Sequence, residues 1–376
     1  MKIAKRLLPL LLFVLAVLGI GCSLQNKAAV EEVITEELDL LKDLDSDTAQ
    51  KYISYKTLFP DVTESTTLST IVQEVFSLYF QDFDYKILDI DVDNAKHHAT
   101  AKLRLTTLDS KVLARDFAAA RLEWILHKAA AYDSQDTEDS SCSLEDCYQI
   151  MYELLCNHSY ETKKTECSLE LRSTDEKNEN WEIISTSSFE NDLVGGLLTY
   201  LSDTSLLSPE DTLSVYFQTL KHMTSDEMSS FLGVESILNS SDSVKNKIAS
   251  ALVNKVHSTF DYEILNCTID GYTASIETNI TTFDSDSILV SYQEELAAYM
   301  STPDAVYDGS VKRYEKSVAL LLEKIENCEE LTTASATFRM IHDGSSWKLN
   351  DNDHILGDAI FGTLSTSPVD SEETAD

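Results

Sequence analysis

The stretch FDYKIL at positions 83–88 decides how this chain is organised, because it returns as FDYEIL at 260–265. Downstream, TTLDS at 106–110 returns as TTFDS at 281–285. The offsets are 177 and 175 residues, so the loop between the matched segments is two residues shorter in the second copy. This period is far longer than that of a solenoid repeat, and it therefore predicts two related domains.

Two shorter echoes flank these matches. The segment LKDL at 41–44 resembles LKHM at 220–223, and WEI at 181–183 resembles WKL at 347–349. Four echoes that occur in the same order are improbable by chance. They indicate that a whole folding unit, rather than a single hairpin, is duplicated.

Each copy continues from the repeated stretch into a predicted hairpin. Apolar and acidic residues alternate over 88–92, and apolar and polar residues alternate over 265–270. Alternation with a period of two is typical of a half-buried strand. The segments 99–105 and 274–280 are the predicted partner strands.

Helical sequence surrounds both hairpins. Two further strands close each copy, around Leu169 and Trp181 in the first and around Thr337 and Trp347 in the second, before a short helix. Helices packed on antiparallel strands define an α+β fold, so we expect two tandem copies of a curved antiparallel sheet packed by helices. The predicted helices cover 31–44, 68–80, 111–132, 144–156, 209–223, 244–257, 287–300 and 311–327.

The N-terminal segment reads as an export signal. It begins with Lys2, Lys5 and Arg6, continues with an apolar stretch over 7–20, and ends in small residues before a cysteine. The apolar stretch is shorter than the roughly 18 residues typical of a transmembrane helix.

The end of this segment resembles a bacterial lipobox, because Gly21 precedes Cys22. The resemblance implies cleavage between these two residues and a diacylglyceryl group on the Cys22 sulfur. Gly19 stands where the lipobox usually has Leu. An ordinary signal peptide, or an uncleaved anchor with an incidental cysteine, is the alternative.

The predicted organisation follows from these signals and from the repeats. It consists of a lipoprotein signal peptide over 1–21, a lipid-linked leash over 22–30, a first α+β repeat over 31–204, a second over 205–364, and a disordered acidic tail over 365–376.

The charge of the chain excludes one class of partner. The net charge is −36, and removal of a signal that contains three basic residues lowers it to −39. Such a surface repels nucleic acid and anionic lipid head groups, so we expect no nucleic-acid binding and a body that stands off the bilayer. No glycine lies between Cys22 and Gly195, so a Gly-rich phosphate loop cannot form there and no nucleotide cofactor is expected.

Six of the seven cysteines follow Cys22. An even number in an exported chain favours disulfides, and no Cys-x-x-Cys pair indicates a metal site. Cys147 and Cys156 lie nine residues apart on one predicted helix. The helix rises about 13 Å over that distance, which is too far for a disulfide between them. Cys267 with Cys328 is the simplest pair, and the connectivity is otherwise open. The disulfide candidates are Cys142, Cys147, Cys156, Cys167, Cys267 and Cys328.

Three aspartates imitate the start of a calcium-binding loop. Asp89, Asp91 and Asp93 match the first ligand positions of an EF-hand, but the glycine and glutamate that such a loop needs are missing. We therefore interpret them as the solvated face of a strand, where Lys102 and Arg104 can pair with them.

The repeated Asp-Tyr pairs carry the type of residues that an isomerase uses as base and oxyanion donor. Asp84 adjoins Tyr85, and Asp261 adjoins Tyr262. Neighbours on a strand point to opposite faces and cannot converge. We therefore predict that the tyrosines pack and the aspartates sit at the strand start.

Other polar clusters have structural explanations. His97 and His98 are predicted surface residues of a hairpin, and no carboxylate spacing completes a metal set with them. Asp351, Asp353 and His354 precede the last helix, where Asp353 or Asn352 would serve as the helix cap.

The three tryptophans have two readings. Trp124, Trp181 and Trp347 could form the floor of a ligand pocket, but packing in the core is the commoner fate of such aromatic side chains.

The closing hairpin HDGSSWKL at 342–349, together with Cys22, carries a family resemblance. It is similar to the closing hairpin of uncharacterised Gram-positive lipoproteins with one or two nuclear-transport-factor-2-like (cystatin-like) domains. The first copy keeps Trp181 but lacks the glycine turn. The resemblance implies a cone-shaped sheet, which some enzymes of that superfamily use as an active site.

These observations predict an extracytoplasmic lipoprotein anchored to the bacterial cell membrane through acylated Cys22, with a non-enzymatic role in binding or envelope assembly. The expected partner is an envelope protein or a small ligand, and no catalytic residue, metal or cofactor is assigned. The alternative is a small-molecule binder, or an isomerase- or hydrolase-type enzyme, that uses the sheet cone. An open cone with converging polar groups would favour the alternative, whereas a cone filled with apolar side chains would exclude it.

Overall fold

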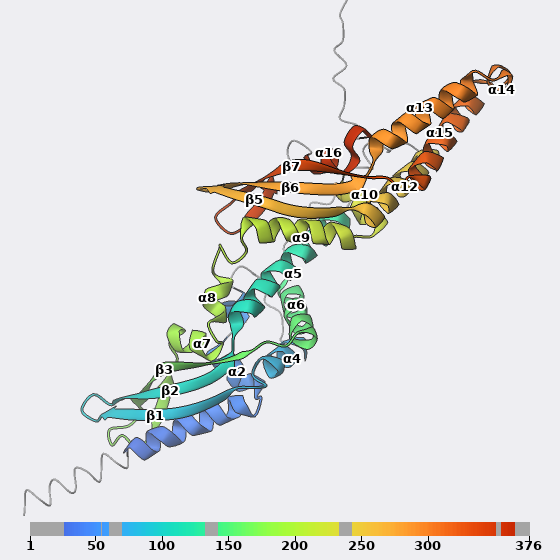
Figure 1. The fold of residues 1–376 in the computed structure, drawn as a ribbon. Helices are drawn as coiled ribbons and strands as arrows, with labels where there is room; N and C mark the ends of the chain where they lie inside the picture. Colours follow the sequence, from blue (N-terminus) through green and yellow to red (C-terminus); the bar gives the residue numbers. More distant parts are fainter. Residues whose placement is uncertain are drawn as a thin grey trace, which may run out of the picture. The chain divides into compact units, whose positions relative to one another are not determined.

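The chain folds into two units, each built around one sheet (Figure 1). The computed structural model describes residues 26–53, 55–59, 70–131, 142–232, 243–350 and 355–364. Unit 1 comprises Met1–Arg121 and Cys142–Leu206, and unit 2 comprises Leu122–Ser141 and Leu207–Asp376. Both sheets have four antiparallel strands in chain order, packed against helices. The predicted α+β class with two antiparallel sheets is thereby confirmed.

Unit 1 holds the first sheet, whose strands are β1 (Asp84–Asp93), β2 (His98–Leu108), β3 (Thr162–Ser173) and β4 (Trp181–Ile184). A helix over 26–42 precedes the sheet. The further helices are α2 (Ser46–Tyr52), α3 (Tyr55–Leu58), α4 (Thr70–Tyr79), the first part of α5 (Ser110–Ala131), α6 (Leu144–Asn157), α7 (Ser187–Leu193) and α8 (Leu197–Leu201).

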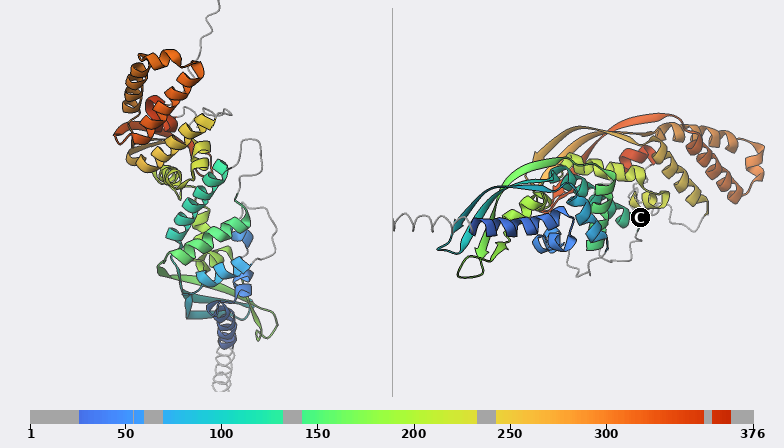
Figure 2. Two further views of the ribbon diagram at one scale, coloured as in Figure 1. Left: turned by 90° about the vertical axis from the view of Figure 1, so that its right-hand side faces the viewer. Right: turned by 90° about the horizontal axis from the view of Figure 1, so that it is seen from below.

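Unit 2 repeats this plan with β5 (Asp261–Asp270), β6 (Thr273–Phe283), β7 (Leu331–His342) and β8 (Trp347–Asn350). Its helices include the last part of α5 and, in addition, α9 (Pro209–His222), α10 (Ser225–Phe231), α12 (Ser243–Thr259), α13 (Ser285–Met300), α14 (Pro303–Tyr307), α15 (Ser310–Asn327), α16 (Ile355–Phe361) and the 3-10 helix η1 (Gly362–Leu364). Figure 2 shows both units from two further directions.

The repeated sequences occupy equivalent places in the two sheets. Asp84 lies opposite Thr106 and Asp261 lies opposite Thr281, so the two echoes pair with each other in both units. The register shifts between Ile87 and Asp89 in one unit and between Ile264 and Asn266 in the other. A bulge at the same place in both copies shows that the duplicated stretch encodes strand pairing as well as strand identity.

Apolar spacing explains how the helices pack on the sheets. In the helix over 26–42, Val30, Ile34 and Leu38 are completely buried, and their spacing of four residues places them on one face. Alternate residues of β2 face the same core, because Ala101 and Leu103 are also completely buried.

The core of unit 2 includes residues from the sequence of the first repeat. Leu126 and Ala130, near the end of α5, are buried in the same cluster as Phe217, Ile276 and Phe283. Helix α5 is therefore continuous in sequence but contributes side chains to the cores of both units.

Some sequence-based expectations need adjustment. Residues 26–30, expected in the leash, are helical, and Val30 is completely buried. Among the described helices, none is both long and apolar enough to cross a membrane. The predicted signal, cleavage position and acidic tail lie outside the described residues.

Candidate functional site

In each unit the repeated Asp-Tyr pair forms hydrogen bonds with a preceding helix, and we call this arrangement the polar clasp. Asp84 accepts a hydrogen bond of 2.7 Å from Lys42, and the Tyr85 hydroxyl donates to Asp39 at 2.8 Å. In unit 1 these two hydrogen bonds join the first helix to the start of β1. They explain why the repeat at 41–44 and the repeat at 83–88 both recur in the second copy.

In unit 2 the clasp uses α9. Lys221 donates to Asp261 at 2.7 Å, and the Gln218 side chain donates to the Tyr262 hydroxyl at 2.9 Å. Both lysines lie three residues after the residue that contacts the tyrosine, which is one helical turn. The clasp is thus conserved between the copies in its geometry.

Electrostatics agree with a structural role for the clasp. The hydrogen bond from Lys42 holds the pKa of Asp84 below its usual value, and Lys221 does the same for Asp261. Partial burial, and then the hydrogen bond to Asp39, raise the pKa of Tyr85 to about 12. Each aspartate and tyrosine has its own partner on a helix, and the structure does not bring them together as base and oxyanion donor.

The basic residues of β2 pair with a partner other than the aspartate triplet. Lys102 and Arg104 bind Glu166 of β3 at 2.7 and 2.6 Å, whereas Asp93 pairs with Lys96 at 2.9 Å. The expected pairing of Lys102 and Arg104 with the triplet is therefore corrected. The reason is that β2 has β3 as a second neighbour, and Glu166 lies directly opposite Arg104 in that register.

Glu166 predicts a component of acid sensitivity. Hydrogen bonds from Lys102 and then Arg104 lower its pKa to about 2, from an ordinary value of 4.5. Its stabilising contribution is therefore present above about pH 4.5 and is lost as the pH falls from there toward 2. The native chain should have a higher Tm than the Glu166→Gln variant above pH 4.5, and this difference in Tm should shrink as the pH falls toward 2. Thermal unfolding of both chains from pH 6 to pH 2 measures it. The effect is small because the pair is exposed; a difference independent of pH would contradict it.

The predicted surface histidines lie at the first hairpin. His97 occupies its turn with a left-handed φ of 53° and contacts the Asn178 side chain at 2.8 Å. His98 begins β2 and lies 3.8 Å from Glu170. Among the described residues, no group of three or more His, Cys, Asp or Glu side chains is arranged to hold a metal ion. Asp351, Asp353 and His354 lie outside those residues.

Two of the tryptophans are core residues. Trp181 and Trp347 are buried, and the Trp181 ring nitrogen donates to the Asn178 carbonyl at 3.0 Å. Trp124 is half-buried and lies under the Lys128 ammonium, 4.5 Å from the ring centroid.

No disulfide joins the six downstream cysteines in the structure, which describes all of them. The sulfur atoms of Cys142 and Cys147 lie 3.4 Å apart. Cys267 lies opposite Ile276 on β6, whereas Cys328 contacts the Asp284 carbonyl beyond the end of that strand. The structure therefore does not bring Cys267 and Cys328 together, since roughly 25 Å of strand separates their positions.

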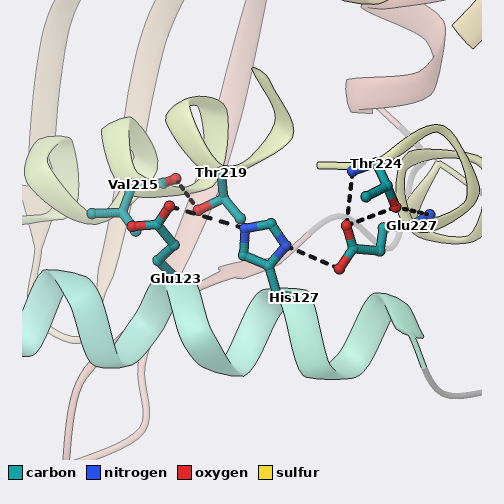
Figure 3. A network of polar contacts seen from close by, with 6 residues as sticks. All are labelled: Glu123, His127, Val215, Thr219, Thr224 and Glu227. Carbon is teal, nitrogen blue, oxygen red and sulfur yellow. Dashed lines mark hydrogen bonds and ion pairs between the residues drawn. The ribbon is translucent and has the colours of Figure 1, made fainter. Parts of the chain in front are cut away.

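A histidine with two carboxylates lies in unit 2 (Figure 3). His127 contacts Glu227 at 3.1 Å and Glu123 at 4.0 Å. The second oxygen of Glu227 accepts hydrogen bonds from the backbone and the hydroxyl of Thr224, which is the N-cap of α10. One carboxylate oxygen of Glu227 thus joins α10 to His127 of α5, and the other completes the capping box of α10, so the network positions these helices.

Each unit has a hollow among its described residues. In unit 1, apolar and aromatic side chains, including Phe59 and Phe76, enclose a cavity of about 10 Å³, which is room for about one water. In unit 2, an open groove of about 530 Å³ lies between α12 and α15, lined by polar side chains that include Lys247, Asn254 and Glu326.

The end of a helical hairpin in unit 2 exposes a group of large apolar residues. Helices α13 and α15 extend beyond the sheet, and α14 lies at their far end (Figures 1 and 2). The side chains of Val306, Tyr307 and Val311 are 79%, 87% and 68% exposed. Met300 and Tyr314 are about half exposed. We call these five residues the tip surface.

Local interactions hold the tip surface in place. Thr302 caps α14, and the following proline occupies the first position of that helix, as expected for a helix start. The Tyr299 hydroxyl donates to Asp308 at 2.8 Å, which closes the link between α13 and α15. Val311 and Tyr314 are three residues apart on α15 and therefore share a face.

The tip surface is electrically balanced in a very acidic chain. Residues 300–316, which contain the tip surface, include three acidic and three basic side chains. The basic residues are Lys312, Arg313 and Lys316. Sequence reasoning did not select this region, although adjacent Val306 and Tyr307 in a short link would have been the signal.

The structure thus defines an α+β protein with two similar sheets and an exposed group of large apolar residues. No known protein-family profile matches the chain, and no curated protein matches it significantly. Among solved structures, the crystal structure of a candidate lipoprotein, ycdA, from Bacillus subtilis aligns at 12% sequence identity with a TM-score of 0.26. The alignment covers 74% of this chain and 96% of that chain.

Proposed function

We propose that the protein is an exported lipoprotein, anchored through Cys22, that docks a partner protein of the cell envelope on its tip surface. The observation that carries this proposal is the exposure of Val306, Tyr307 and Val311. Large exposed apolar residues grouped at one end of a charged protein mark interaction sites, and aromatic residues dominate the binding energy of such sites.

The charge of the chain favours a protein over a bilayer as the occupant of the tip surface. At −36 the chain is repelled by anionic head groups. The tip surface has no net charge of its own, so an apolar area on another protein can approach it without a local penalty.

The anchor rests on the sequence alone. The lipobox-like end of the signal at Cys22 supports lipidation, and two acyl chains would hold the protein at the membrane surface. The order of helices and hairpins supports the further proposal that each unit is a nuclear-transport-factor-2-like domain with a curved sheet.

The alternative, small-molecule binding or catalysis inside a sheet cone, has less support. The enclosed cavity in unit 1 is lined by residues of helices and of the segments next to them, not by strand residues, and it has an apolar lining with room for about one water. It supplies neither space nor hydrogen bonds for a substrate.

Photocrosslinking in intact cells of the native host tests the proposal. A photoreactive phenylalanine analogue at position 307 is expected to give one dominant protein adduct. The matched control is the same analogue at position 272, where the native tyrosine of unit 2 is also mostly exposed, at 73%. We expect the adduct to be absent at 272 and diminished when Cys22→Ala releases the chain.

The isolated partner then allows a quantitative comparison. Tyr307→Ser should weaken its binding by about 30-fold, the effect typical of a buried aromatic anchor, whereas Tyr272→Ser should have no effect. Adducts with lipid alone at position 307, or equal effects of both substitutions, would contradict a protein-docking function.

A further inference from the structure

Two buried thiols meet at the start of α6. The side chains of Cys142 and Cys147 are 2% and 0% exposed, and their sulfur atoms are 3.4 Å apart. This separation is close to contact between non-bonded sulfur atoms.

The helix cap explains why these two residues meet. Ser143 is the N-cap of α6 and forms a capping box with Asp146. Cys142 therefore precedes the cap and Cys147 is the fourth residue after it, which are the two positions whose side chains pack together in a hydrophobic staple. The Cys147 amide donates to the Ser143 carbonyl at 3.0 Å, so the backbone also maintains this arrangement.

We propose that Cys142 and Cys147 form a disulfide in the exported protein. The inference rests on the proposed export, because disulfides persist in oxidising compartments. The two thiols lose two protons and two electrons, and a new S–S bond forms. The electrons pass to the exchangeable disulfide of a thiol-disulfide oxidoreductase or of a small-molecule disulfide, which is reduced to two thiols.

The required movement is small. A disulfide has a sulfur separation of about 2.0 Å, so side-chain rotation and a slight adjustment of the cap would suffice to close the gap. The hydrogen bond to Cys142 and burial raise the pKa of Cys147, which keeps it a thiol in the packed helix. Exchange needs a thiolate, so the bond is expected to form before the start of α6 packs.

The disulfide would replace the packing contact between the Cys142 and Cys147 side chains by a covalent bond. Helix α6 packs against α4, and Tyr148, next to Cys147, is among the largest completely buried side chains. Fixing the start of α6 thus stabilises the helical layer of unit 1. Loss of the bond is expected to lower Tm by about 5 °C.

Cleavage after Glu145 makes the bond directly observable, because Glu145 lies between the two cysteines. The full-length chain is trapped from cells with acid and alkylated without reduction, then digested with a glutamate-specific protease. Mass spectrometry is expected to find the peptides on either side of Glu145 joined, and separate after reduction. Cys142→Ser and Cys147→Ser should each abolish the linked species, whereas Cys156→Ser, at the exposed far end of α6, should preserve it.

A parallel sample separates this inference from the proposed function. The purified full-length chain is reduced and unfolded in urea and then refolded in a mixture of reduced and oxidised glutathione, so that the bond can form before α6 packs, wherever the chain resides in the cell. Surface labelling of intact cells reports export independently. An exported chain in which both thiols are alkylated, or a chain that stays reduced in oxidised glutathione, would overturn the disulfide and leave the docking function standing. If Cys142 and Cys147 are linked but the chain gives no adduct at position 307, the disulfide stands and the docking function is overturned.

Discussion

Gly195→Ala is expected to destabilise unit 1 by about 3 kcal/mol or more. Gly195 has a left-handed φ of 52°, which costs a residue with a side chain about 1–2 kcal/mol. A Cβ atom there would lie 2.0 Å from the Leu108 carbonyl oxygen and 2.9 Å from the Ser110 hydroxyl. Leu108 is paired with Thr162 in the sheet, so its carbonyl cannot move without disturbing the strand register.

The neighbouring glycine provides the control. Gly196 also has a positive φ, of 85°, but a Cβ atom there would meet only the ring of Tyr200, at 3.1 Å, and that ring is partly exposed and can turn away. Gly196→Ala should therefore cost only about 1–2 kcal/mol. Urea unfolding followed by far-UV circular dichroism measures both. Equal losses of stability for the two variants would show that the close approach of Gly195 to β2 does not exist.

Leu126→Ala is expected to destabilise unit 2 by about 2–4 kcal/mol, although Leu126 belongs to the sequence of the first repeat. Its side chain is 7% exposed and lies in the same core cluster as Phe217 and Ile276. The substitution removes buried apolar atoms and leaves a cavity that the surrounding helices can only partly fill.

Hydrogen exchange locates the effect of this substitution. Peptides from β6 should exchange faster in Leu126→Ala, while peptides from β2 should change little. Val112→Ala is the control on the same helix, because Val112 is 57% exposed and its loss should cost at most about 0.5 kcal/mol. Faster exchange confined to β2 would mean that this part of α5 belongs to unit 1.

The repeats were the strongest source of correct prediction. Matching sequences at 83–88 and 260–265 predicted equivalent hairpins, and the structure places both at strand starts with a bulge at the same position. Alternation predicted strands because the period of two is a property of neighbouring residues. The partners of Lys42 and Lys221 were not predictable in this way, because each lysine meets its aspartate only after a helix has packed on a sheet.

The candidate sites were less predictable for the same reason. All six downstream cysteines were disulfide candidates, but spacing along a helix could only exclude a pair. Selecting Cys142 with Cys147 requires knowing that Ser143 caps α6, which places them on one side of the helix start. The tip surface was not foreseen, since only the folded hairpin of α13 and α15 places Val306 and Tyr307 at its far end, where they remain exposed.

The sequence by itself determined the duplication and the α+β class, and it alone predicts an anchor at Cys22, because repeats, local periodicity and short motifs depend only on residues near one another in the chain. Tertiary structure alone decided that Glu166 pairs with both Lys102 and Arg104, that Leu126 belongs to the core of unit 2, and that the tip surface stays exposed. These outcomes depend on contacts between residues tens of positions apart. Such contacts arise from the packing of whole helices and strands, whose partners the local pattern does not specify.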